Sequence, residues 1–111
     1  MAEIRGSDSL SPREIKTYER QYKEAAELFE NSVDRCMKSD NPYQRAKFRE
    51  VMDRAMHIMN EAARALKQKN SSLTKQNEKI KEDFAAFNED KSPQAGKKLI
   101  DDLEKAKHSV A

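Results

Sequence analysis

Several residue types are scarce in this chain, and each scarcity limits what the protein can be. The 111 residues include no tryptophan, one cysteine, two glycines and three prolines. Two isolated glycines cannot build a glycine-rich phosphate loop, and one cysteine excludes an intramolecular disulfide and a cysteine zinc site. A sequence poor in glycine and proline, with 38% charged residues, is typical of helices packed as a bundle or coiled coil.

Long hydrophobic runs and a strong excess of one charge are also missing. No segment approaches the ~20 apolar residues that a membrane span needs. The first ten residues, MAEIRGSDSL, lack the apolar core of a signal peptide and are expected to form a disordered tail. We therefore expect a cytoplasmic protein, although secretion without a cleaved signal is also compatible with the sequence. The 22 basic and 20 acidic residues lack the basic excess of a dedicated nucleic-acid or membrane-surface protein.

The three prolines share one local pattern, in which serine or asparagine precedes the proline. The pattern occurs as SPRE, NPYQ and SPQA, with prolines at 12, 42 and 93. Proline fits the first turn of a helix, and the preceding side chain can accept a hydrogen bond from a free backbone amide. Glu14 and Gln44 also stand at the capping-box position. The sequence therefore predicts a helix start at each proline.

Apolar residues recur every three or four positions after these starts, as they do on one face of a helix. Helices are predicted at about 12–38, 42–69, 72–89 and 93–109. Lys67, Lys69 and Asn70 favour a break near 70–72, but a single long helix is an alternative because the apolar stripe stays nearly in phase.

The predicted fold class is all-α. We expect an antiparallel helical hairpin, extended to a three- or four-helix bundle or coiled-coil-like assembly over residues 11–90. The segment 93–109 is predicted to be a short helix that docks on this bundle or folds with a partner. Since only 36% of the residues are hydrophobic, we also expect partial dependence on self-association or a partner.

Residues with catalytic or metal-binding potential lie in patterns that favour structural roles. Asp53, His57 and Glu61 share one helical face and could bind a divalent metal, but this row lies almost opposite the apolar stripe and indicates a solvated face. Cys36 falls on the apolar stripe, where it acts as a small core residue. His108 suits a helix C-terminus. We therefore expect no enzyme activity, cofactor or metal.

A methionine-rich apolar face after Pro42 is the candidate partner-binding site. It consists of Val51, Met52, Met56, Met59 and Ala63. Methionines most often fill a bundle core, but such a face can also accept an amphipathic helix. We predict a non-enzymatic interaction module, namely a small adaptor, a secretion-type chaperone or a self-assembling subunit. Its partner would be another protein's amphipathic helix or the chain itself as a homo-oligomer.

A nucleic-acid-associated regulator is the alternative prediction. Its candidate residues are Arg45, Lys47, Arg49 and Arg54, which crowd a helix start where the dipole disfavours basic residues. Acidic residues interleave with them and dilute the positive field, so nucleic acid is the less favoured partner.

Overall fold

The computed structural model describes residues 10–90 and 92–110, and these residues form four helices without a strand. The helices are α1 (Pro12–Lys38), α2 (Pro42–Ala65), α3 (Ser71–Asp90) and α4 (Pro93–His108). The predicted all-α bundle is therefore confirmed. The first nine residues, where a disordered tail was predicted, lie outside the described part.

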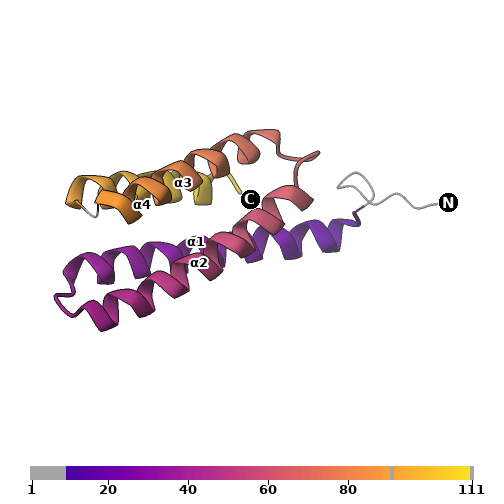
Figure 1. Cartoon of the computed structure of the whole chain (residues 1–111). Helices are drawn as coiled ribbons and strands as arrows, with labels where there is room; N and C mark the ends of the chain where they lie inside the picture. The colour runs from indigo at the N-terminus through magenta and orange to yellow at the C-terminus, as the bar shows by residue number, and fades with distance from the viewer. Residues whose placement is uncertain (1–9, 91, 111) are drawn as a thin grey trace.

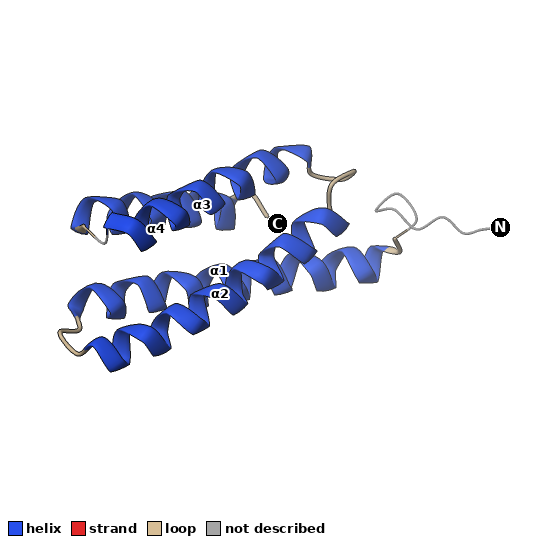
Figure 2. Cartoon of the chain, viewed as in Figure 1, coloured by secondary structure: helices blue, strands red, loops and turns tan. Residues whose placement is uncertain are grey.

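The four helices form two antiparallel pairs that pack side by side (Figure 1). α1 and α2 make a long hairpin, and α3 and α4 make a shorter pair against one face of it. α4 packs against both α1 and α3, and α3 also contacts α2. The bundle measures 53 × 22 × 20 Å, and only short loops join its helices (Figure 2). The C-terminal helix is thus docked within the chain's own bundle.

The helix starts form where the proline patterns predict them. At α1, the Glu14 amide donates to Ser11 Oγ (3.2 Å) and the Ser11 amide donates to Glu14 Oε1 (2.9 Å), a complete capping box. At α4, Ser92 Oγ accepts from the Ala95 amide at 3.1 Å. Each serine oxygen satisfies a backbone donor that has no partner within its helix.

The turn between α1 and α2 uses a different hydrogen-bond arrangement from the predicted capping box. Asn41 Oδ1 accepts from the amides of Tyr43 and Gln44, at 2.8 and 3.4 Å. The Asn41 amide, however, donates to Ser39 Oγ rather than to Gln44, whose side chain instead accepts from the Ser39 hydroxyl at 3.1 Å. Ser39 therefore takes the role that the sequence pattern assigned to Gln44.

α2 and α3 are separate helices, as the favoured alternative predicted, although α2 ends at Ala65 rather than near residue 69. Asn70 stabilises the connection at several points. Its amide donates to the Leu66 carbonyl (2.8 Å), its Oδ1 accepts from the Leu73 amide (3.2 Å), and its Nδ2 donates to the Ser109 carbonyl (3.1 Å). Asn70 thus caps α3 and connects the turn to the end of α4.

Apolar side chains from all four helices form one core between the two pairs. Phe29 of α1 and Phe84 of α3 meet edge to face, with ring centroids 4.9 Å apart. The large side chains that are completely covered are Tyr22, Phe29, Val33, Met52, Met59, Leu66, Leu73, Ile80, Leu99 and Leu103. Burial of the hairpin's apolar side chains against α3 and α4 therefore stabilises the hairpin.

A buried polar chain sets the position of α3 against the hairpin. The Tyr22 hydroxyl donates to Asn77 Oδ1 at 3.0 Å, and Asn77 Nδ2 donates to Asn60 Oδ1 at 2.6 Å. The three residues belong to α1, α3 and α2, so one network joins three helices. Sliding α3 along the hairpin would leave buried polar atoms without partners, which disfavours other registers.

Gly96 allows the first turn of α4 to approach α1 closely. A Cβ built at this position would overlap the flexible side chain of Met37 at Sδ, so a larger residue here would displace that side chain. A glycine inside a helix costs about 0.5–1 kcal/mol relative to alanine.

Candidate protein-interaction surface

The predicted partner-binding methionine face lies inside the bundle. Met52 and Met59 have no exposed surface, and Met56 and Ala63 are buried as well, while Val51 is half-buried. These buried side chains belong to the common core that α3 and α4 help to form. The methionines therefore fill the bundle core, which is the more common role of methionine in a bundle, and other parts of the same chain cover the face that was the candidate partner-binding site.

The four candidate basic residues do not form one patch. At ~100° per residue, Arg45 and Arg49 lie on one side of α2, and Lys47 and Arg54 lie roughly on the opposite side. Arg45 also donates from Nε to the Ser39 carbonyl at 2.7 Å, so it serves the turn of the hairpin. The four basic side chains are therefore divided between two sides of α2, whereas the predicted nucleic-acid site needs them on one side.

The described residues contain no group of three histidine, cysteine, aspartate or glutamate side chains placed to hold a metal ion. The row of Asp53, His57 and Glu61 is exposed, and Cys36 is buried. His108 Nε2 lies 3.4 Å from Glu104 Oε1, one helical turn away on α4. These residues fit the structural roles that the sequence indicates.

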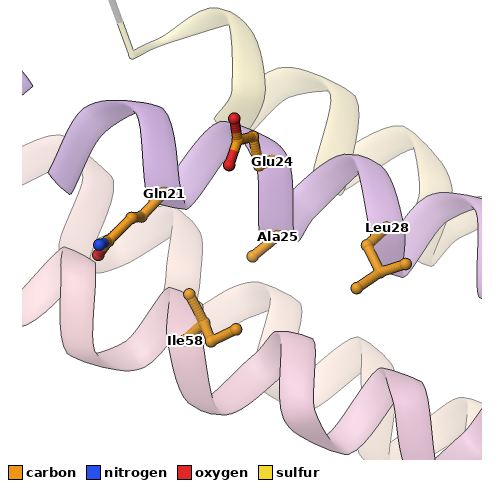
Figure 3. A pocket seen from close by; sticks show the side chains of 5 residues that line it. All are labelled: Gln21, Glu24, Ala25, Leu28 and Ile58. Atoms are coloured by element: carbon orange, nitrogen blue, oxygen red, sulfur yellow. The ribbon is translucent and has the colours of Figure 1, made fainter. Parts of the chain in front are cut away.

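A shallow apolar groove runs between α1 and α2 on the surface of the hairpin (Figure 3). Leu28 on α1 is 46% exposed, and Ile58 on α2 is 40% exposed. Ala25 lies between them, and Gln21 and Glu24 complete the lining. Leucine and isoleucine side chains this exposed are unusual for the chain, since the only other large hydrophobic residue with comparable exposure among the described residues is a tyrosine.

This groove faces away from the α3–α4 pair. Glu30 of α1 contacts α4 through Lys107, and Leu28 lies ~160° around α1 from it. Asn60 of α2 bonds to α3, and Ile58 likewise lies ~160° around α2 from it. The hairpin therefore has an inner face, which the α3–α4 pair covers, and an outer face, which carries Leu28 and Ile58.

Charged residues flank the groove in an ordered way. On α1, Glu24 lies toward the open end of the hairpin and Arg35 toward its turn; on α2, Glu61 lies toward the open end and Lys47 toward the turn. All four are exposed and lie within ~60° of Leu28 or Ile58 around their helices. Among the described residues, Glu61 has only a 3.9 Å contact with Arg64, and the other three form no salt bridge. Arg54, between Lys47 and Glu61 on α2, is also exposed and lies ~40° from Ile58.

The buried carboxyl groups lie elsewhere. Glu19 of α1 pairs with Lys69 of the α2–α3 connection at 3.0 Å, and the others lie on the surfaces where α4 docks. Asp83 of α3 lies 3.2 Å from Lys98. Burial and hydrogen bonding to Asp102 raise the pKa of Asp83 to about 6. Burial also raises the pKa of Glu30, which accepts from Lys107 Nζ at 3.0 Å. These carboxyl groups join helices to one another and are not placed to act on an external ligand.

The chain matches no protein-family model, no curated protein and no solved structure in the comparisons made with each. None of the helices in the described residues combines the length and apolar character needed to cross a membrane. The geometry of the chain's own surface is therefore the basis for a functional proposal. Sequence periodicity missed Leu28, because this residue lies off the apolar stripe of α1 and has no local feature that marks it.

Proposed function

We propose that the protein is a non-enzymatic helical interaction module whose outer hairpin face binds the apolar side of an amphipathic helix. This proposal keeps the predicted type of partner and moves the binding surface from the methionine face to the groove lined by Leu28 and Ile58. The observation that carries it is the exposure of two facing aliphatic side chains on a bundle whose other large apolar residues are mostly covered.

The shape of the groove suits a helix. Two antiparallel helices leave a furrow along their contact line, and a third helix can insert its apolar side chains there at i, i+3, i+4 and i+7 spacing. Ala25 provides a small side chain at the floor, with Leu28 and Ile58 on the two sides. Val51 precedes Ile58 by seven residues, so it extends the same line along α2.

The charged flanks favour an amphipathic partner over a purely apolar one. Acidic and basic residues border the groove, so a bound helix can place charges of opposite sign beside them. Exposed pairs of this kind add little affinity each and mainly determine orientation. We therefore expect apolar contacts at Leu28 and Ile58 to supply most of the binding free energy.

The proposal can be tested with a designed peptide of leucine, lysine and glutamate that forms an amphipathic helix. Fluorescence anisotropy of the labelled peptide, titrated with dilute protein, measures the dissociation constant. Leu28→Glu and Ile58→Glu each place a charge in the groove and should weaken binding at least about tenfold, because the charge loses hydration on binding. Ala85→Glu introduces the same charge at an exposed alanine of α3 and should leave binding unchanged.

Circular dichroism should show the same helicity for all three variants, because every substituted side chain is on the surface or partly exposed. Binding that is equal in wild type and in Leu28→Glu would contradict the groove as the docking site. A peptide that does not bind wild-type protein at any concentration, in a chain that also does not self-associate, would contradict the interaction function itself.

A further inference from the structure

We propose that the occupant of the outer groove is a second copy of this chain, packed hairpin against hairpin in an antiparallel, two-fold symmetric dimer. This inference rests on the proposed interaction function and names its partner. The juxtaposition that points to it is the order of the flanking charges along both helices, which is complementary to itself after a half-turn.

The half-turn brings unlike charges together because, along each helix of the outer face, the acidic residue lies nearer the open end of the hairpin and the basic residue nearer the turn. Glu24 and Glu61 lie toward the open end, and Arg35 and Lys47 lie toward the turn. A second copy reversed end to end places its basic end over the acidic end of the first. Glu24 then meets Arg35 of the other copy on α1, and Glu61 meets Lys47 of the other copy on α2.

One symmetry axis passes close to the midpoints of both charge pairs. The midpoint between Glu24 and Arg35 falls between residues 29 and 30 of α1, and the midpoint between Lys47 and Glu61 falls at residue 54 of α2. α1 ends at Lys38 and α2 begins at Pro42, so residue 54, twelve residues after Pro42, is level with about residue 26 of α1. An axis placed between the two midpoints therefore lies within about two residues, or ~3 Å, of each.

The apolar residues follow the same symmetry. The midpoint between Val51 and Ile58 falls between residues 54 and 55, beside the charge midpoint at residue 54, so Ile58 of one copy packs over Val51 of the other. Leu28 lies within about two residues of the axis and packs near its own symmetry mate. In an isologous interface each contact occurs twice, so this arrangement buries Leu28, Val51 and Ile58 of both copies and flanks them with four ion pairs. Arg54, exposed ~40° around α2 from Ile58 and close to the axis, lies near its own symmetry mate, and this like-charge contact opposes part of the attraction.

The interface is small, so the dimer should depend on concentration. The charged flanks extend over 11 residues of α1 and 14 residues of α2, or ~16–21 Å of helix. Interfaces of this extent lie at the low end of specific complexes and are typical of reversible association. Raised salt should weaken the dimer moderately, because exposed ion pairs are screened while apolar contacts are not.

Sedimentation equilibrium of the full chain over about a hundredfold range of concentration measures the dimer constant. The wild type should shift from monomer to dimer across this range. Glu24→Arg and Arg35→Glu should each weaken the dimer about tenfold, since either change makes two attractive pairs repulsive. The double variant Glu24→Arg/Arg35→Glu restores unlike charges and should return to within about threefold of the wild type.

Glu27→Arg is the matched control, because Glu27 is exposed on α1 but lies ~100° around the helix from Leu28. It should leave the dimer constant unchanged. A wild type that stays monomeric at every concentration overturns the proposal, and so does a double variant that is no better than its parents.

The peptide titration separates this proposal from the broader one. A monomeric wild type that still binds the amphipathic peptide, with binding lost in Leu28→Glu, overturns the second copy as occupant and supports a foreign helix. A monomeric wild type that binds no peptide overturns both. A dimer rescued by the double charge reversal supports both, whether or not the peptide competes for the groove.

Discussion

The inner and outer faces of the α1–α2 hairpin both carry large apolar side chains, yet the other described helices cover only one of them. Phe29 faces inward and has no exposed surface, whereas its neighbour Leu28 faces outward and is 46% exposed. Met59 and Ile58 repeat this contrast on α2, with 0% and 40% exposure. Consecutive residues thus lie in two environments: the inner side chains are buried in the bundle, and the outer side chains are exposed among the described residues.

The comparison shows that apolar periodicity alone does not identify a binding surface. A face is open only when no other part of the chain reaches it, and α3 and α4 are long enough to cover one side of the hairpin. Substitutions that act on one face and not on the other are therefore the direct way to test the division.

The largest effect should come from Phe29→Ala. Removing a completely buried phenyl ring leaves a cavity between the two helix pairs and should lower the free energy of unfolding by about 3–5 kcal/mol. Leu28→Ala should change it by less than about 0.5 kcal/mol, because the side chain is at the surface. Urea unfolding of dilute samples measures both, and similar losses in the two variants would contradict the division into faces.

A smaller loss is expected from Tyr22→Phe. This change removes the hydroxyl that donates to Asn77 and leaves a buried amide oxygen with one partner fewer, which should cost about 1–3 kcal/mol. Tyr43→Phe is the control, because the Tyr43 side chain is exposed at the turn. The same unfolding experiment reports both, and a neutral Tyr22→Phe would show that the network does not stabilise the inner face.

The smallest effect should be a pH dependence in the attachment of α4 to α3. The pKa of Asp83 rises from its ordinary 3.8 to about 6 in the folded chain. Because the folded state binds this proton more tightly, its contribution to stability is complete below about pH 4 and is lost as the pH rises through about 6. Lys98, 3.2 Å from the ionised carboxylate, offsets part of the loss and keeps the effect small.

Thermal unfolding at a series of pH values between 4 and 8 measures this dependence. The groups that act on the α3–α4 cluster are Asp83, Asp102 and Lys98, with Glu82 nearby. Asp83→Asn should reduce the fall in melting temperature over this range, whereas Asp53→Asn on the exposed side of α2 should not. An unchanged pH profile in Asp83→Asn would locate the titrating group elsewhere.

The sequence predicts the helices well where a local signal determines them. Pro12, Pro42 and Pro93 each begin a helix because proline and the preceding cap act within one turn. The end of α2 is less well predicted. After Ala65 the chain continues in turns that keep helix-like hydrogen bonds up to Asn70. Lysines near residue 69 are compatible with such a connection and with a helix end, so they do not locate the end of α2.

The candidate site is less predictable because it depends on tertiary contacts. Met56 and Ile58 both widen the apolar stripe of α2, but only the packing of the other helices decides that Met56 is buried and Ile58 exposed. Leu28 is a single leucine off the apolar stripe of α1. It forms part of an apolar groove only because the folded hairpin brings Ile58 of α2 to the same groove. The division between core and surface is thus a property of the packed helices.

The position of Cys36 has a kinetic consequence. Its thiol is the only one in the chain and is almost completely buried on α1. A maleimide added to the native protein can therefore react with it only while the bundle is transiently open. The labelling rate under native conditions reports the population of that open state when closing is fast. One unmodified side chain thus allows the frequency of opening to be followed over time, without denaturant and without an introduced probe.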